Sequence, residues 1–259
     1  MKFTPKRLEA TRDLSRGRTD YQGLIVAFLT FLAALGITYA ALGYFVDYAA
    51  VWMDDDTEVA LLGSLERAYP AVSHGDDSEE GVNLHRAKTV FKQLTTYPNL
   101  RKLPYELRMI DFDAPNAFAI PGGIVALSPK LFDWVKTDSG LAFVLAHELA
   151  HHQRRHVTKR LGRGLLLMLF GVLVSSVSDA TLGNLSGLAI ARYSQSQEHE
   201  ADALAIKIMF ATYGHADGAL EFLNKALDES NEQGGALWDS HPSTQDRIDR
   251  VRDLLADYR

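Results

Sequence analysis

Two histidines and a glutamate stand at the spacing of a metal-dependent hydrolase. His147, Glu148 and His151 lie within the sequence HELAH, so on a helix the two histidines share one face. Two imidazoles on one face can bind one metal ion, and the glutamate beside them can reach a metal-bound water. This pattern is typical of zinc peptidases, which generate a hydroxide nucleophile at neutral pH. We therefore expect His147 and His151 to bind one zinc ion and Glu148 to act as the catalytic base.

A catalytic zinc also needs a third protein ligand and one open position. One class of zinc peptidases carries a glycine and a third histidine three and six residues after the second ligand, and Arg154 and Val157 exclude it here. Glu198 and Asp202 are again four residues apart, on the polar face of a later predicted helix. We expect Glu198 to bind the metal and Asp202 to orient a ligand histidine through its free ring nitrogen. Glu200 is the competing ligand, but it lies about 200° around the helix from Glu198.

The elements around these residues predict an α+β fold that is mainly helical, with a small sheet beside the active-site helix. The apolar run 140–146 leads into the HELAH motif, and Asp138 and Ser139 are candidate N-caps for that helix. Strands are expected at 103–110, 117–120 and 123–127, the last two joined by a Pro-Gly-Gly turn. Further helices are expected at 54–67, 84–97, 129–136, 216–229 and 243–256, and an acidic loop at 75–81.

Four ordered blocks resemble metallopeptidase family forty-eight, which includes HtpX, the CAAX prenyl proteases, Oma-type proteases and BepA-like proteins. The blocks are residues 116–123, 147–151, 194–202 and 241–244 with Arg247-Ile248, and together they span about residues 85 to 255. Gln195 departs from the pattern, because the family often has an arginine there that could contact substrate. The resemblance implies an HExxH zinc-metallopeptidase domain with one zinc ion per chain and protein or peptide substrates.

The same resemblance points to substrate contacts and to one more histidine at the site. In such peptidases an edge strand beside the active-site helix binds the substrate backbone by strand addition, which makes Asn116, Gly122 and Gly123 candidate substrate-binding residues. The alternative is an ordinary structural hairpin. His241 is expected at the catalytic site, either as a donor to the tetrahedral oxyanion or as a plug in the open position of the metal. Its plain alternative is a turn that opens the last helix.

An apolar segment near the N-terminus predicts a membrane anchor. Residues 24–46 contain no charged side chain, and their length is enough to cross about 30 Å of hydrocarbon. Basic residues precede this segment and acidic residues follow it, so the positive-inside rule places the N-terminus in the cytoplasm. We expect a cytoplasmic segment at 1–22, a single-pass anchor at 23–46 in a bacterial cytoplasmic membrane, and a zinc metallopeptidase domain at 47–259 on the periplasmic or outer side. A cleaved signal peptide is the rival interpretation, but the apolar stretch is too long for one.

A second apolar run, residues 165–177, is too short and too interrupted by serines to predict a span with the same force. It has three interpretations: a buried core helix, a helix on the membrane surface, and a second span that returns near 182–190. We favour a core or membrane-surface helical hairpin between the two helices that carry metal ligands.

Composition narrows the function further. The chain has 259 residues, 47% of them hydrophobic, with a net charge of -6 and no cysteine. The acidic balance gives no sign of nucleic-acid binding, and the lack of cysteine excludes disulfides and a thiolate metal site. We expect a membrane-anchored zinc endopeptidase that acts on misfolded or misassembled envelope proteins. A chaperone or assembly factor that uses the same cleft, with weak or latent proteolysis, is the alternative, although the intact Glu148 argues against an inactive enzyme. A membrane scaffold with a vestigial site is a third.

Overall fold

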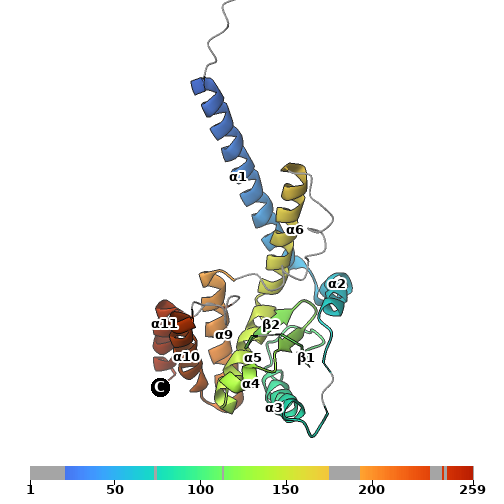
Figure 1. Ribbon diagram of the computed structural model, residues 1–259, viewed down its shortest axis with the longest axis vertical. Helices are drawn as coiled ribbons and strands as arrows, with labels where there is room; N and C mark the ends of the chain where they lie inside the picture. Colours follow the sequence, from blue (N-terminus) through green and yellow to red (C-terminus); the bar gives the residue numbers. More distant parts are fainter. Residues whose placement is uncertain are drawn as a thin grey trace, which may run out of the picture. The chain divides into compact units, whose positions relative to one another are not determined.

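The computed structural model of the chain describes residues 21–72, 75–112, 114–174, 193–233, 241 and 244–258. It forms two units, the described residues up to Leu42 and the unit Gly43–Arg259, which we treat separately. In chain order the elements are α1 Tyr21–Trp52, α2 Asp55–Leu62, the 3-10 helix η1 Gly63–Ala68, α3 Glu79–Leu94, β1 Glu106–Met109, β2 Ala117–Ile120, β3 Ile124–Leu127, α4 Leu131–Trp134, α5 Asp138–Gln153, α6 His156–Val174, α9 Gln195–Tyr213, α10 Gly218–Gln233 and α11 Gln245–Ala256 (Figure 1).

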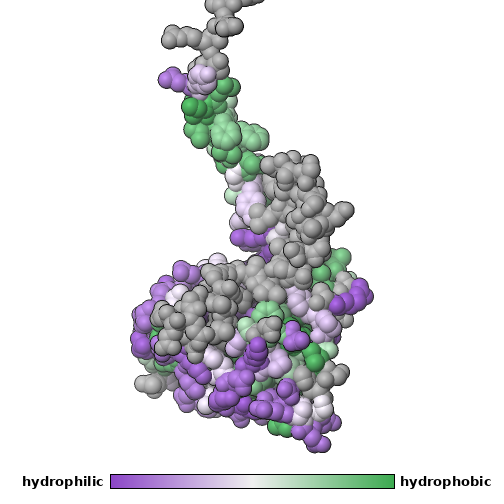
Figure 2. Space-filling model, viewed as in Figure 1, coloured by the Kyte–Doolittle hydropathy of each residue, from purple (hydrophilic) through white to green (hydrophobic). Residues whose placement is uncertain are grey.

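Helix α1 is long and apolar, and it carries the predicted anchor. Within the part of the chain that the structure describes, it is the one helix whose length and composition suit a membrane span. Its apolar side chains are exposed, and they form the green surface of this helix in Figure 2. The helix begins at Tyr21 and ends at Trp52, so it extends beyond the predicted range 23–46 at both ends. An exposed apolar helix of this length suits a lipid environment.

The sheet has three described strands in the order β1-β3-β2, with β1 parallel to β3 and β2 antiparallel to it. The turn between β2 and β3 needs glycine, because Gly122 and Gly123 have φ values of 93° and 98°. These values lie in the region that glycine adopts without the steric cost of a Cβ. At Gly123 a Cβ would also lie 3.0 Å from the Cβ of Leu103 and 3.2 Å from the carbonyl oxygen of Pro104. The turn therefore packs closely against the chain that leads into β1.

Helix α5 lies at the centre of the second unit. It packs against α9, α10, α3 and β2, and every residue from Gly140 to His152 is buried. Thr137 is the N-cap of α5, with its side-chain oxygen accepting a hydrogen bond from the backbone N–H of Gly140 at 3.0 Å. The prediction of Asp138 or Ser139 as N-cap is wrong by one or two residues, because the threonine before them already satisfies the first turn.

The predicted fold class is confirmed, while several predicted element bounds differ from the observed ones. Helix α3 begins at Glu79 rather than near residue 84, because Ser78 caps it by accepting a hydrogen bond from the N–H of Gly81. Glu79 and Glu80 then lie in its first turn, where the helix dipole favours negative charge. Part of the predicted acidic loop is therefore helix. The helix expected at 54–67 divides into α2 and η1.

Helix α6 contains the first part of the second apolar run. Val157 and Leu161 are buried near its start, whereas Leu165 is 40% exposed. Arg163 forms an ion pair with Asp47 in the last part of α1, with the guanidinium Nε 2.9 Å from a carboxylate oxygen. Residues 175–192 lie outside the described residues, so the three interpretations of the run 165–177 and its return near 182–190 stay predictions.

Four charged side chains join α2 to the end of α5. Arg101 Nη2 lies 2.6 Å from Asp55 Oδ1 and 2.8 Å from Glu58 Oε2. Arg155 contacts the same two carboxylates at 3.3 Å and 3.2 Å. Arg101 also donates a hydrogen bond from Nη1 to the carbonyl oxygen of His152 at 3.0 Å. This network holds the last turn of α5 against α2, and the last turn is the part of α5 that carries the second histidine of the HELAH motif.

Candidate metal centre

Three imidazoles and one carboxylate converge at a buried point between α5 and α9. One ligand atom from each of His147, His151, Glu198 and His241 lies within 4.8 Å of every other. The Nε2 atoms of His147 and His151 are 3.0 Å apart. His241 Nδ1 lies 3.2 Å from His147 Nε2 and 3.0 Å from Glu198 Oε1. The arrangement can therefore present three nitrogen donors and one oxygen donor to a single ion.

The donor set fits a zinc ion. Zinc binds imidazole nitrogen and carboxylate oxygen at about 2.0–2.1 Å in tetrahedral geometry, which places ligand atoms about 3.3–3.4 Å apart. The separations of 3.0 Å, 3.2 Å and 3.5 Å between the ligand atoms here are close to that value. Burial opposes ionisation of Glu198, but His241, Arg247 and His147 hold the pKa of its carboxyl well below the usual range. The carboxylate is therefore in the charged form that a metal ligand needs.

The first turn of α9 decides which glutamate faces the histidines. Ser194 and Gln197 form a capping box, in which the serine Oγ accepts from the N–H of Gln197 and the glutamine Oε1 accepts from the N–H of Ser194. Glu198 follows directly and is 1% exposed. Glu200 is half exposed and lies 3.6 Å from the Nε2 of His156. The structure thus places Glu198 in the cluster and Glu200 outside it.

The ring nitrogen of His147 that points away from the cluster contacts Asp202, and Arg247 in turn holds Asp202. Its Nδ1 lies 3.0 Å from Asp202 Oδ1. Arg247 donates from Nε and Nη2 to the two oxygens of Asp202, both at 2.8 Å, and its Nη1 lies 2.7 Å from Glu198 Oε2. Although burial lowers the pKa of His147, Glu198 and Asp202 outweigh that effect and raise it to about 9. Asp202 thus contacts the free ring nitrogen of His147, which is the geometry that its predicted role requires.

From the sequence, Arg247 was assigned no role at the site, although its side chain is one of the most buried in the structure. It is 2% exposed and bridges Asp202 to Glu198. A signal was available, since Arg247 shares the buried face of α11 with Ile248 and Val251. An arginine is almost never fully buried unless it is paired, so one on a buried helix face predicts acidic partners. The sequence does not show which acids these are.

Glu148 lies beside the cluster as a buried carboxylate. Its Oε1 is 3.5 Å from His241 Nε2, and its Oε2 is buried without a hydrogen-bond partner among the described residues. Burial raises the pKa of this carboxyl above its usual value, against the opposing influence of His241 and His147. A carboxylate with a raised pKa and a free oxygen is suited to accept a proton from a water molecule.

His241 and Glu148 line one small cavity. This cavity has a volume of about 10 Å³, and its lining includes Phe143, Val144 and Phe222. That volume is near the lower limit for one water molecule.

The predicted substrate contacts lie at the two ends of strand β2, next to α5. Strand β2 is at the edge of the sheet and contacts α5. Asn116 precedes this strand, and its backbone N–H donates to the Oγ of Ser128 at 2.9 Å. Gly122 and Gly123 form the turn at its other end. The binding of substrate by these three residues stays a prediction.

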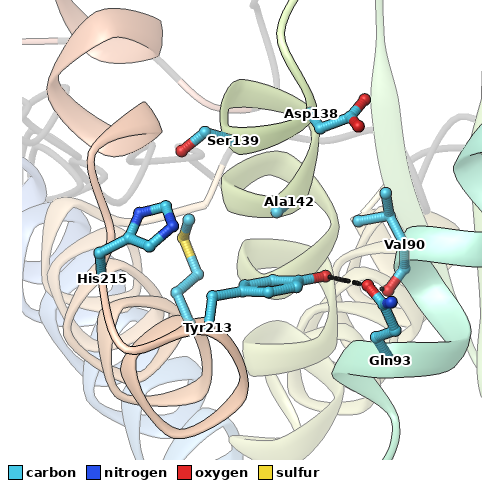
Figure 3. Close-up of a pocket in the computed structure, with 8 residues that line it drawn as sticks. Val90, Gln93, Asp138, Ser139, Ala142, Tyr213 and His215 are labelled. Carbon is cyan, nitrogen blue, oxygen red and sulfur yellow. Dashed lines mark hydrogen bonds between the residues drawn. The ribbon is translucent and has the colours of Figure 1, made fainter.

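A second cavity, of about 160 Å³, lies at the other end of α5. It is lined by residues of α3, of α9 and of the first turns of α5, among them Ser139 and Ala142. Figure 3 shows the Tyr213 hydroxyl pointing at the side chain of Gln93, to whose Oε1 it donates at 3.0 Å. None of the described lining residues belongs to the four-residue cluster. This cavity is therefore separate from the candidate metal chemistry.

Comparison with known proteins decides the family. The model of peptidase family M48 matches residues 83–255, which is well over half of the chain. The chain belongs to peptidase family M48. The resemblance drawn from the four sequence blocks is thereby confirmed. The M48 match includes α5, α9 and residue 241, and so all four residues of the cluster.

Individual M48 relatives are similar over a similar part of the chain. The mitochondrial metalloendopeptidase OMA1 of Schizosaccharomyces pombe is 30% identical over 175 residues, covering 64% of this chain and 51% of the relative. The beta-barrel assembly-enhancing protease of Escherichia coli K12 is 28% identical over 176 residues, covering 62% and 36%. The metalloprotease YcaL of the same organism is 29% identical over 171 residues, covering 61% and 65%. The chain thus spans about half or less of the length of the first two relatives.

Proposed function

We propose that this protein is a membrane-anchored, zinc-dependent endopeptidase. The observation that carries the proposal is the convergence of His147, His151 and Glu198 beside the buried Glu148, in a chain of a peptidase family. These three residues hold one zinc ion, and Glu148 is the catalytic base. The anchor is residues 23–46 within α1, and the peptidase domain is residues 47–259.

Each residue of the site has one task in peptide-bond hydrolysis. When bound, zinc polarises the scissile carbonyl and lowers the pKa of water to about 7. Glu148 takes the proton of the attacking water on its free oxygen and passes it to the departing amine. Asp202 keeps the ring of His147 in the orientation that directs its Nε2 into the cluster. Strand β2, with Asn116, Gly122 and Gly123 at its ends, pairs with the substrate backbone.

Misfolded or misassembled envelope proteins are the proposed substrates. Two relatives are named as a metalloendopeptidase and as a beta-barrel assembly-enhancing protease, which supports protein substrates. Recognition through a strand edge reads the main chain rather than particular side chains, and this suits unfolded segments. The basic residues before α1 and the acidic residues after it support a domain on the outer side of a bacterial cytoplasmic membrane.

Glu148→Gln tests the catalytic step. The amide keeps the size of the side chain but cannot accept the proton, so cleavage of an unfolded protein such as casein should fall by at least about 100-fold. Zinc content, measured on the same full-length protein in detergent, should remain at the wild-type level because Glu148 is not a ligand.

Glu79→Gln is the matched control, since it makes the same change at an exposed carboxylate in α3. It should leave both cleavage and zinc content unchanged. Undiminished cleavage by Glu148→Gln would exclude the proposed mechanism, and a wild-type protein without zinc would exclude the metal site.

A second function is favoured by one feature of the site. His241 lies among the ligand atoms and, with Glu148, lines a cavity of only about 10 Å³. A metal site whose open position is occupied by this imidazole fits a chaperone or assembly factor that holds clients in the same region with weak or latent proteolysis. Client binding without cleavage, in the wild type and in a variant that lacks the imidazole, would favour this function over the endopeptidase.

A further inference from the structure

The two ligand histidines of α5 are supported in different ways. His147 has the carboxylate of Asp202 behind it, whereas the Nδ1 of His151 lies 3.0 Å from the Nδ1 of His156. His156 is 1% exposed, and its ring centroid is 5.0 Å from that of His151. One imidazole thus has a charged partner at its free nitrogen, and the other has a second imidazole.

The backbone between α5 and α6 brings His156 into this position. Helix α5 ends at Gln153, Arg154 caps it, and Arg155 has a φ of 58° before α6 begins. A non-glycine residue in the left-handed region is uncommon and persists where the surroundings determine it. The side chain of Arg155 is held by Asp55 and Glu58. The reversed backbone turns His156 back onto the end of α5.

The proposed role of His151 as a metal ligand decides which of the two Nδ1 atoms donates. His151 turns its Nε2 into the cluster, so this nitrogen must offer a lone pair and the proton of the neutral ring lies on Nδ1. His151 therefore donates and His156 Nδ1 accepts. His156 then carries its own proton on Nε2, and this atom faces Glu200 Oε2 at 3.6 Å. With these tautomers, both N–H groups point away from the cluster, and that of His156 is on the side of a half-exposed carboxylate.

A stacked tyrosine restrains the same ligand. The ring of Tyr193 stacks on that of His151, with centroids 3.8 Å apart and an interplanar angle of 25°. The guanidinium carbon of Arg160 lies 3.8 Å from the centroid of the Tyr193 ring. The stack limits tilting of the His151 ring out of its plane, while the hydrogen bond to His156 limits rotation of the ring within that plane. The two contacts together determine the direction of the His151 lone pair.

We propose that His156 is the positioning residue of His151. The proposal rests on the metal site of the proposed function and adds a role for one residue outside that site. His156 acts as a neutral acceptor at the position where His147 has an aspartate.

The test is metal affinity in the full-length protein in detergent. His156→Phe removes the acceptor while filling the space. It should raise the zinc dissociation constant, measured by chelator competition, by about 10- to 100-fold. His156→Asn keeps an acceptor at the δ position and should restore most of the affinity. The absorption spectrum of the cobalt-substituted protein should change in His156→Phe and resemble the wild type in His156→Asn.

His152→Phe is the matched control. His152 is equally buried and adjacent to His151, but its Nε2 donates to the carbonyl oxygen of Ile124 on β3. This variant should keep the wild-type zinc affinity, even if the protein is less stable. Equal zinc affinities of His156→Phe and the wild type, or equal losses in His156→Phe and His152→Phe, would overturn the proposal.

Nitrogen-15 NMR of the histidine rings in the unaltered, zinc-loaded protein gives a result that needs no variant. We expect His156 to be protonated at Nε2 only and His151 at Nδ1. A proton on His156 Nδ1 would overturn the proposal even if His156→Phe failed to fold. A wild type that binds no zinc would instead contradict the proposed function, so the two failures are distinguishable.

Discussion

His241 is the residue on which access to the site depends. Its Nδ1 lies with the ligand atoms of His147 and Glu198, and its Nε2 faces Glu148. A neutral imidazole is a good zinc ligand, so His241 is placed to occupy the position that a catalytic zinc would leave open. A group at the open position cannot at the same time stabilise an oxyanion there. Of the two predicted roles of His241, this placement supports the plug.

His241→Ala should therefore raise basal proteolysis. If the open form is a minor state of about 0.1–10% of the molecules, removal of the plug should increase the rate of casein cleavage by about 10-fold or more. Zinc content should stay the same, because three protein ligands remain. A lower rate would show that the histidine is an oxyanion donor, and an unchanged rate would contradict both roles.

At the scale of elements, the end of α5 depends on α2. Glu58 is 1% exposed and contacts both Arg101 and Arg155, while Asp55 contacts the same pair. Removing one member of a buried charge cluster leaves the others without full compensation. Because Arg101 also bonds the carbonyl of His152, a change in α2 reaches the metal cluster through the last turn of α5.

Glu58→Ala should be strongly destabilising. The loss leaves two guanidinium groups to share Asp55, and the cost should be about 3–5 kcal/mol in the free energy of unfolding, measured by denaturant titration in detergent. Asp56→Ala is the control, because Asp56 is exposed in the same first turn and should cost less than about 1 kcal/mol. Equal effects of the two substitutions would show that the cluster contributes nothing beyond ordinary surface charge.

At the scale of the whole molecule, one apolar helix and one peptidase domain suggest a tethered enzyme. The described part of α1 has the length and composition of a membrane span, and the family match begins later in the chain, at residue 83. A tether restricts the domain to the neighbourhood of the membrane, and the side on which it lies determines which proteins it meets. The charge asymmetry around the anchor predicts the outer side.

Reporter fusions test this orientation. A reporter that works only outside the cytoplasm should be active when fused after Arg259 and inactive when fused after Ser15, because these positions lie on opposite sides of the predicted anchor. Carbonate washing should leave the protein in the membrane. Activity of a cytoplasmic reporter fused after Arg259 would overturn both the orientation and the proposed compartment.

The amino-acid sequence by itself determined the features that depend on local spacing. The histidines of HELAH share a helix face because they are four residues apart, wherever that helix packs. The turn at Gly122 and Gly123 follows from a backbone that glycine tolerates best, and the apolar length of α1 follows from composition. The sequence predicted the ends of helices less precisely. At the start of α5, Thr137 and Asp138 are both good N-caps, and only the observed hydrogen bond distinguishes them.

Only the tertiary structure decided which distant side chains support the site. Arg247 reaches Asp202 across 45 positions of sequence, because α11 packs against α9. His156 meets His151 because Arg155 adopts a left-handed conformation that periodicity does not predict. Helix periodicity reports which residues share a face, but the partner of that face depends on packing between elements far apart in the chain. The motifs that carry the candidate metal ligands could therefore be predicted from the sequence, whereas the contacts that orient those ligands could be identified only in the folded structure.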